Sequence, residues 1–279
     1  MSPDPMAVMS DLPTELSSTG VAGLDNILYG GLTPNRLYLI EGNPGSGKTT
    51  LAMQYLLEGV RRNESCLYVT LSETKAELAA VAKSHGWSLD GIELVELVAS
   101  EAELDTDNQQ TMFQPADFEL GQTTKAVLAE VERVKPRRLV IDSLSELRLL
   151  AQSSLRFRRQ ILALKQFFTG RDCTVLVLDD NTAAANDLQL HSIAHGVIGL
   201  EHLSPQYGAE RRRLRVVKLR GQRFRGGLHD FNITTGGLDV FPRLVAAEHV
   251  EGRERAVLAG GVPELDRLLG GGIDFGTST

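Results

Sequence analysis

Short runs of apolar and often β-branched residues recur along the middle of the chain, and longer segments of helical periodicity separate them. Strands are predicted at 36–42, 66–72, 92–97, 137–143 and 174–180. Since these runs are apolar at nearly every position, both faces of each strand are expected to be buried, as in a parallel sheet. Helices are predicted at 48–62, 75–86, 118–134 and 154–169. This alternation indicates an α/β domain with a mostly parallel central sheet and flanking helices.

The pattern changes after Leu190, where only strands are predicted. They lie at 196–203, 212–220, 227–234 and 237–241. We interpret them as antiparallel strands that extend one edge of the sheet. Residues 100–117 have no clear period and are expected to form a surface loop, and residues 1–17 are expected to be a disordered tail.

A repeat near the end of the chain bears on domain organisation. The segment GVAGLD that begins at Gly20, with LxGGL after it, recurs as GVPELD from Gly261, with LxGGI after it. The offset is 241 residues at both ends of the repeat, since 261 − 20 and 273 − 32 give the same value. We therefore expect one domain over 18–247, followed over 248–279 by a linker and the truncated start of a second copy.

Composition narrows the class of protein. The chain has 279 residues, of which 42% are hydrophobic and 23% charged, an ordinary globular balance. No apolar run approaches the ~20 residues of a membrane span. The net charge of −7 argues against a broad nucleic-acid-binding surface. Cys66 and Cys173 each open an apolar run and are expected to be buried thiols, as suits a reducing cytoplasm.

The strongest chemical signal follows the first strand. The segment Gly42-x4-Gly47-Lys48-Thr49 stands between a predicted strand and a predicted helix, which is the context of a phosphate-binding P-loop. Glycines let backbone N–H groups point at phosphate oxygens, and the helix N-terminus adds its dipole. Lys48 is expected to reach the β- and γ-phosphates and Thr49 to bind Mg²⁺. The expected contacts with ATP or ADP are Asn43, Pro44, Gly45, Ser46, Gly47, Lys48, Thr49 and Thr50.

Two acidic residues complete the predicted site. Asp142 ends the apolar strand Leu139–Ile141, where P-loop proteins place an acid that holds Mg²⁺. Glu73 follows the second strand and is our candidate to orient and polarise the attacking water. The alternative for Glu73 is a structural role at the start of the next helix, where an acid favours the helix dipole.

A basic segment, Arg211 to Arg220, leaves three interpretations open. It is a solvated strand face, a contact for nucleic-acid phosphates, or the source of residues that reach the ATP of a neighbouring subunit. For the third interpretation, Lys218 and Arg220 are two residues apart and share one face of a strand.

Taken together, these motifs resemble those of the KaiC family of RecA-like ATPases, over nearly the whole chain. The resemblance rests on STGVAGLDNILYGGL, EGNPGSGKTTLAMQYL, YVTLSET, KSHGW, RRLVIDSLSEL and RRRLRVVKLRG. The Lys-x-Arg-Gly of the last motif is the most specific. Clock KaiC proteins carry two such domains in tandem, which agrees with the repeat. The resemblance implies a RecA-like fold and a homo-hexameric ring with Mg-ATP at each subunit interface.

The resemblance also assigns roles to particular residues. It gives Lys218, Leu219 and Arg220 contacts with nucleotide, with Lys218 and Arg220 acting in catalysis from the neighbouring subunit. Ser84, in the KSHGW motif, is a weaker candidate for a nucleotide contact. Clock or signalling proteins are the implied partners, and a serine/threonine autokinase activity would belong to the second domain.

Two departures from the family pattern affect the functional expectation. The family has two adjacent glutamates after the second strand, whereas this chain has Ser72 and Glu73, so hydrolysis is expected to be slow or to depend on Glu73. Asp179 and Asp180 stand where clock proteins have Thr-Glu, so contacts inside the ring are expected to differ. The alternatives to a switching ATPase are a RecA-like DNA motor and a nucleotide-gated scaffold with little turnover.

Overall fold

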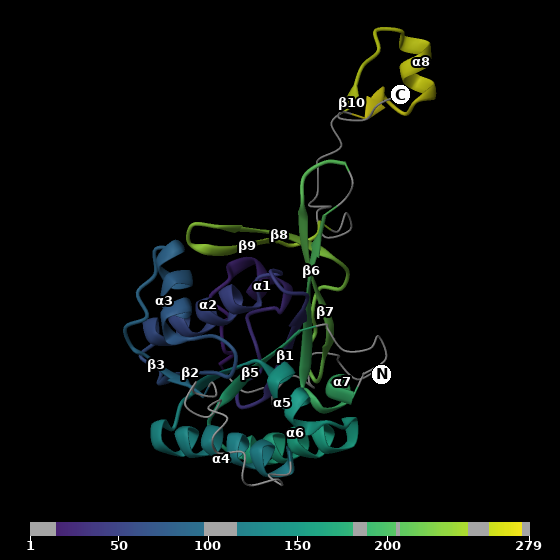
Figure 1. Cartoon of the computed structure of the whole chain (residues 1–279). Helices are drawn as coiled ribbons and strands as arrows, with labels where there is room; N and C mark the ends of the chain where they lie inside the picture. The colour runs from purple at the N-terminus through teal and green to yellow at the C-terminus, as the bar shows by residue number, and fades with distance from the viewer. Residues whose placement is uncertain (1–14, 98–115, 181–188, 205–206, 245–256, 275–279) are drawn as a thin grey trace. The chain divides into compact units, whose positions relative to one another are not determined.

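The computed structural model describes residues 15–97, 116–180, 189–204, 207–244 and 257–274 (Figure 1). The chain divides into two compact units, residues 1–242 and residues 243–279. Parts of three expectations lie outside the described residues. These are the tail up to residue 14, the loop up to residue 115 and the linker from 248 to 256.

One sheet forms the centre of the first unit. In the described part of the chain it has nine strands in the order β3-β2-β4-β5-β1-β6-β7-β8-β9. The strands are β1 Leu37–Gly42, β2 Cys66–Thr70, β3 Ile92–Glu96, β4 Arg138–Asp142, β5 Thr174–Asp180, β6 Gly196–Leu203, β7 Arg211–Leu219, β8 His229–Thr234 and β9 Gly237–Phe241. Pairing is parallel from β3 to β6 and antiparallel from β6 to β9. The predicted α/β fold, with antiparallel strands at the C-terminal edge, is confirmed.

β6 is the strand at which the sheet changes direction. It pairs in parallel with β1 and antiparallel with β7, so only one of its two neighbours matches the antiparallel interpretation. Three short helices were also not predicted: α1 Ala22–Ile27, α5 Leu144–Ala151 and α7 Gln189–Ile193. α5 and α7 both follow strands of the parallel sheet and help to build the site.

Helices cover both faces of the sheet (Figure 1). On one face lie α1, α2 Lys48–Arg61 and α3 Lys75–Ser84. On the other lie α4 Ala116–Val134, α5, α6 Ser154–Phe168 and α7. Side chains alternate along a strand, so Tyr38 and Ile40 of β1 enter the first core while Leu37 and Leu39 enter the second. The two-sided burial explains the continuous apolar runs. Both cysteines are buried and free, as predicted.

The second unit has the local conformation of the first copy of the repeat. It contains β10 Val257–Leu258, α8 Pro263–Leu268 and β11 Ile273–Asp274. Asp266 accepts a hydrogen bond from the N–H of Gly260 at 2.8 Å, as Asp25 does from Thr19 at 2.8 Å. In the first copy the leucines of this motif are buried, whereas Leu265 is exposed. The common geometry supports the repeat, and its assignment to a second domain stays a prediction.

The parallel strands bring their carboxyl ends to one edge of the sheet. Gly42 at the end of β1 pairs with Asp180 at the end of β5, and Thr70 at the end of β2 pairs with Asp142 at the end of β4. In open α/β sheets this edge is where ligands bind. The predicted P-loop residues and Asp142 lie at or just after these strand ends, and Glu73 follows the end of β2.

Candidate functional site

The loop between β1 and α2 has the backbone geometry of a phosphate cradle. Gly47 has φ of 101°, in the left-handed region, and a Cβ there would meet Ile233 Cδ1 at 2.8 Å. Glycine is therefore required at this position both by conformation and by space. Among the described side chains, none caps the amino end of α2 with a hydrogen bond. The first N–H groups of that helix are thus left for an anion.

Lys48 is held at the centre of the loop. It is the first residue of α2, and its side chain is only 8% exposed. Its ammonium group donates to the carbonyl oxygens of Gly42 and Asn43, at 2.8 and 3.1 Å, and contacts Asp180 Oδ1 at 2.7 Å. Asn43 is exposed. The loop therefore keeps a buried cation below a surface that other molecules can reach.

Asp142 lies beside Thr49, as the sequence predicts for a Mg²⁺ site. Thr49 Oγ1 donates to Asp142 Oδ2 at 3.4 Å, and Tyr68 Oη donates to the same oxygen at 2.6 Å. Burial raises the pKa of Asp142 above its ordinary value, while the hydrogen bond from Tyr68 and the charge of Lys48 oppose that shift.

Glu73 follows β2, its backbone is held by hydrogen bonds to Thr70, and one of its carboxylate oxygens has no partner in the described structure. Its N–H donates to Thr70 Oγ1 at 2.9 Å, and Thr70 Oγ1 donates to its carbonyl oxygen at 2.7 Å. In the described structure, Glu73 Oε2 is buried without a hydrogen-bond partner. Helix capping is done by the next residues instead, since Thr74 and Glu77 form a capping box at the start of α3. The capping role considered for Glu73 is therefore filled by Thr74 and Glu77.

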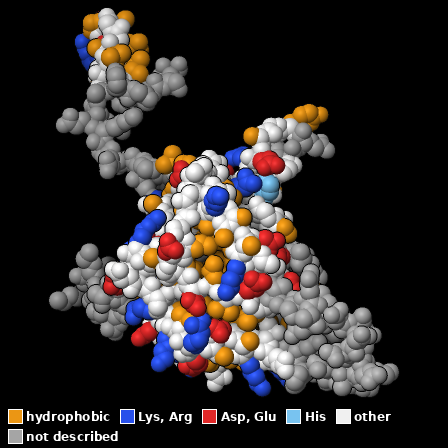
Figure 2. All heavy atoms as spheres, turned by 60° about the vertical axis from the view of Figure 1, so that its left-hand side comes forward, with side chains coloured by type: hydrophobic (Ala, Val, Ile, Leu, Met, Phe, Trp, Pro, Cys, Tyr) orange, Lys and Arg blue, Asp and Glu red, His pale blue; other side chains and the backbone are white. Residues whose placement is uncertain are grey.

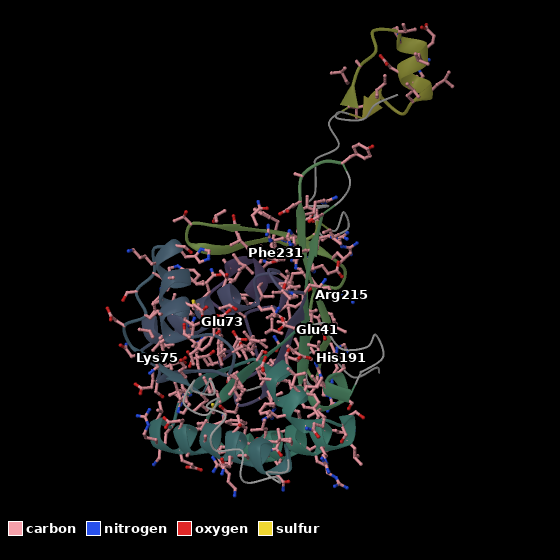
Figure 3. The ribbon with its side chains drawn as sticks, in the orientation of Figure 1. Glu41, Glu73, Lys75, His191, Arg215 and Phe231 are labelled. Carbon is pink, nitrogen blue, oxygen red and sulfur yellow. The ribbon has the colours of Figure 1, made fainter. Side chains whose placement is uncertain are left out.

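The surroundings of Glu73 favour its neutral form. Burial raises the pKa of Glu73, and the carboxylates of Asp142, Glu77 and Asp180 raise it further, whereas Lys48 lowers it. A carboxylate with a raised pKa is a stronger base once ionised. Figure 3 labels Glu73 near Lys75, the first residue of α3.

Two adjacent acids at the end of β5 have different partners. Asp179 is buried and makes a two-pronged ion pair with Arg148 of α5, at 2.7 and 3.1 Å. Asp180 contacts Lys48 instead. Ser145 Oγ lies 3.3 Å from a carboxylate oxygen of each aspartate and accepts from the N–H of Asp180 at 3.2 Å. The P-loop lysine is thereby linked to the helix that follows Asp142.

Lys218 and Arg220 share a face, as predicted, and both bind the carboxyl end of α7. Lys218 Nζ donates to the carbonyl oxygens of His191 and Ala194, and Arg220 donates to that of Ser192 at 2.9 Å. Burial lowers the pKa of Lys218, and the charge of Arg220 lowers it further. A helix C-terminus attracts cations, which accounts for this arrangement.

The strand register places these two cations away from the P-loop of their own chain. Leu219 of β7 pairs with Gly196 of β6, and Gly196 pairs with Tyr38 of β1. Tyr38 is four residues before Gly42, and at ~3.3 Å per residue this separates the two levels by about 13 Å along the strand. Lys218, Leu219 and Arg220 thus lie at the amino edge of the parallel sheet, and the P-loop lies at the carboxyl edge.

A second contact of α7 reaches the strand that carries the P-loop. His191 Nε2 lies 2.7 Å from Glu41 Oε2, and Figure 3 shows the two side chains beside each other. Glu41 immediately precedes Gly42. α7 therefore contacts both the Lys218–Arg220 pair and the end of β1.

The remaining basic residues of β7 are paired on the strand surface. Arg213 and Arg215 face Glu201 of β6 at 3.7 and 3.8 Å, and Arg211 contacts Asp230 of β8 at 3.2 Å. The face that Figure 2 brings forward, from the left-hand side of Figure 1, also carries basic and acidic side chains intermixed. These contacts favour the solvated strand face over a nucleic-acid surface for Arg211 to Arg215.

The hydroxyl of Ser84 forms its hydrogen bond within α3 and not with a residue of the P-loop. It is exposed at the end of α3, and its hydroxyl donates to the carbonyl oxygen of Val81 at 2.7 Å. Trp87 is partly buried and packs against the first core, which agrees with a packing role. The adjacent His85 stacks on Trp87 at 4.6 Å between ring centroids.

Sequence reasoning did not identify two residues that touch the site. Tyr68 lies inside an apolar strand, and no sequence signal separates it from a core residue. Asp180 has a weak signal, because an acid at the end of a strand beside β1 must lie near the P-loop. Recognising that signal requires the strand order, in which β5 lies next to β1.

Comparison with known proteins agrees with this geometry. A family model described as "ATPase: KaiC" matches residues 17–245. The circadian clock oscillator protein KaiC of Thermostichus vulcanus is 30% identical over 275 residues, covering 94% of this chain and 52% of that protein. The KaiC protein of Parathermosynechococcus lividus is 28% identical over 262 residues, covering 91% of this chain and 47% of that protein. The chain thus spans about half the length of these KaiC relatives.

Two further proteins match over nearly their whole length. The UPF0273 protein of Thermotoga maritima is 27% identical over 243 residues, covering 84% of this chain and 98% of that protein. The crystal structure of a KaiC-like protein from Pyrococcus horikoshii shares the fold, with a TM-score of 0.68 and 23% identity, over 82% of this chain and all of that one. In the part of the chain that the structure describes, none of the helices has the length and apolar character to cross a membrane.

Proposed function

This chain belongs to the KaiC family of ATPases, and from that premise we propose that it binds Mg-ATP at its P-loop and hydrolyses it to ADP and phosphate. One observation carries the proposal. Lys48 and Thr49 of the loop, Asp142 of β4 and Glu73 after β2 come from three distant segments and gather at one edge of the sheet. These are the phosphate-binding, metal-binding and water-orienting groups of a P-loop ATPase.

The residues present fit a magnesium ion. Mg²⁺ prefers oxygen ligands and usually takes one or two from protein, with the rest from water and substrate phosphates. Thr49 Oγ1 and Asp142 Oδ2 are oxygen donors 3.4 Å apart. Within the described ranges, no cluster of three or more His, Cys, Asp or Glu side chains forms a protein-only metal cage. When bound, Mg²⁺ would neutralise charge on the phosphates.

The protein groups would divide the remaining chemistry between them. Lys48 stabilises the negative charge of the phosphates from its buried position. Glu73 orients the attacking water and accepts its proton, for which its Oε2 atom is without another partner in the described structure. Tyr68 holds Asp142 in place through its hydroxyl. Ser72 replaces the first glutamate of the family pair, so turnover is expected to be slow.

We further propose that a neighbouring subunit completes the site in a homo-hexameric ring. Leu219, between Lys218 and Arg220, lies about 13 Å in strand register from the P-loop level of its own chain, so a role of these two cations in phosphate chemistry requires another copy. A cation supplied in trans neutralises transition-state charge that the loop itself leaves uncompensated. Leu219 between them would lie at the same interface.

The biological role is proposed at the level of the family. The KaiC relatives are described as circadian clock oscillator proteins, and this chain spans about half of their length. We propose that ATP turnover drives ring assembly or the exchange of a clock or signalling partner. By the family resemblance, a serine/threonine autokinase activity would belong to the second domain alone.

Lys48→Ala tests the proposed binding site. A hydrogen bond to a charged group contributes roughly 1.5–3 kcal/mol, so the affinity for Mg-ATP should fall about 10- to 100-fold. Lys75→Ala is the matched control, because Lys75 is an exposed lysine at the start of α3 and outside the loop. Titration calorimetry measures both affinities. If Lys48→Ala binds Mg-ATP as tightly as the parent protein, the phosphate-cradle assignment is wrong.

A further inference from the structure

The ammonium group of Lys48 has no donor left for a phosphate in the arrangement seen here. A lysine has three N–H donors. Those of Lys48 are directed at the carbonyl oxygens of Gly42 and Asn43 and at Asp180 Oδ1, at 2.8, 3.1 and 2.7 Å. A phosphate oxygen that binds Lys48 must therefore displace one of these three partners.

Asp180 is the partner that a phosphate would replace. The two carbonyl groups belong to the P-loop backbone, whose course is fixed by β1 and by the start of α2. Asp180 is the only charged one of the three described partners, and its side chain is 28% exposed, so water can solvate the carboxylate after release. Two anions on one ammonium group also repel each other, which disfavours a shared arrangement.

A second partner for the released carboxylate is already in place. Ser145 Oγ lies 3.3 Å from Asp180 Oδ2 and accepts a hydrogen bond from the backbone N–H of Asp180 at 3.2 Å. Ser145 belongs to α5, which Arg148 ties to the neighbouring Asp179. The carboxylate can thus leave Lys48 without leaving its own hydrogen-bond network.

We propose that Asp180 is a positioning residue that competes with the terminal phosphate of ATP for Lys48 and passes to Ser145 when ATP binds. We call the Lys48–Asp180 contact the clasp. This inference rests on the proposed function, since it takes Lys48 as the phosphate ligand. The clasp keeps Lys48 in place between turnovers and makes ATP binding weaker than the P-loop alone would allow. It also ties occupancy of the loop to α5, the helix that follows Asp142.

Electrostatics place Asp180 on the phosphate side of the site. Its carboxylate contributes to the raised pKa of both Asp142 and Glu73, so it faces the two acids assigned to the metal and to the attacking water. This location raises a competing explanation, in which Asp180 weakens ATP binding only by repelling the phosphates through space. A clasp, in contrast, acts through Lys48. The two explanations differ in whether the effect of Asp180 needs the lysine.

The test is a double-mutant cycle on Mg-ATP affinity with Asp180→Asn, Lys48→Ala and the double variant. Asp180→Asn should bind Mg-ATP roughly 3- to 30-fold more tightly than the parent protein, as expected for removing a partly screened charge-assisted contact. In the Lys48→Ala background the same substitution should give a much smaller gain, because there is no clasp to release. Asp172→Asn, an exposed residue just before β5 and at the other end of that strand, is the matched control and should leave affinity unchanged.

Each other outcome counts against a defined part of the account. Unchanged or weaker binding by Asp180→Asn, in a variant whose thermal melt shows it folded, overturns the clasp, and weaker binding would make Asp180 a metal or nucleotide ligand. An equal gain with and without Lys48 also overturns it in favour of through-space repulsion. If the parent protein binds no Mg-ATP, the proposed function fails and the clasp fails with it.

Discussion

Replacing Glu73 with glutamine keeps the size of the side chain and removes the base, so it separates chemistry from binding. The structure predicts that the variant folds. The N-terminus of α3 is capped by Thr74 and Glu77, and Glu73 Oε2 makes no hydrogen bond among the described residues that the substitution would break. Affinity for Mg-ATP should also survive, because Lys48 and Thr49 are unchanged. Only the step that activates water should suffer.

The size of the effect follows from the role. General-base catalysis contributes about 10²- to 10⁴-fold to a rate, so turnover by Glu73→Gln should fall by about that factor. The fall should be nearest the lower end if the parent enzyme is already slowed by Ser72. The measurement is phosphate release at saturating Mg-ATP, together with a thermal melt.

Thr74→Ala is the matched control on the adjacent residue. It removes the cap of α3 and should cost about 1 kcal/mol of folding stability while leaving most of the turnover. Glu73→Gln should therefore lower turnover, whereas Thr74→Ala should lower the melting temperature. Unchanged turnover in a folded Glu73→Gln variant would refute the assignment of Glu73 as the base.

Two further predictions concern the same position. Ser72→Glu restores the glutamate pair typical of the family and should raise turnover in the phosphate-release assay; an unchanged or lower rate would show that the serine does not limit hydrolysis. Burial, and next the charge of Asp142, raise the pKa of Glu73 above its ordinary 4.5. Turnover should therefore fall as pH drops through that raised pKa, and this acidic limb should be lost in the residual activity of Glu73→Gln; a limb that persists in the variant belongs to another group.

Local pattern was sufficient for the elements of the parallel sheet and for the position of the candidate site in the fold. The continuous apolar runs predicted β1, β2, β4 and β5 because each of these strands is buried on both faces. The P-loop could be predicted because its chemistry lies in one contiguous segment, Gly42 to Thr49. Asp142 followed from its place at a strand end, which a parallel sheet brings to the same edge.

Contacts that depend on strand order and direction could not be predicted. The direction of β6 is invisible in its apolar pattern, because a strand buried on both faces reads the same in either direction. The Lys48–Asp180 contact requires β5 to lie beside β1.

 Lys48 and Asp180 are 132 positions apart in the sequence, and the pairing of Gly42 with Asp180 brings them together. Tyr68 and the carbonyl groups of α7 were missed for the same reason, since their roles arise from neighbours distant in sequence.

The central claim is that two copies of the chain build each catalytic site, one with its P-loop and the other with Lys218 and Arg220. Arg220→Ala should leave nucleotide binding by isolated subunits almost intact and impair turnover, since a finger residue supplied in trans contributes about 10³- to 10⁵-fold to the rate. Lys48→Ala should lose turnover for a different reason, because its own P-loop lacks the lysine that binds phosphate.

Mixing these two inactive variants tests the claim most directly. Light scattering with and without ATP first establishes that rings form, and differently tagged subunits establish that the rings are mixed. In a mixed ring some interfaces pair an intact loop from Arg220→Ala with an intact Arg220 from Lys48→Ala, so phosphate release should partly reappear. If mixed rings form and phosphate release stays absent, Lys218 and Arg220 act within one chain or only structurally, and the interfacial site is contradicted.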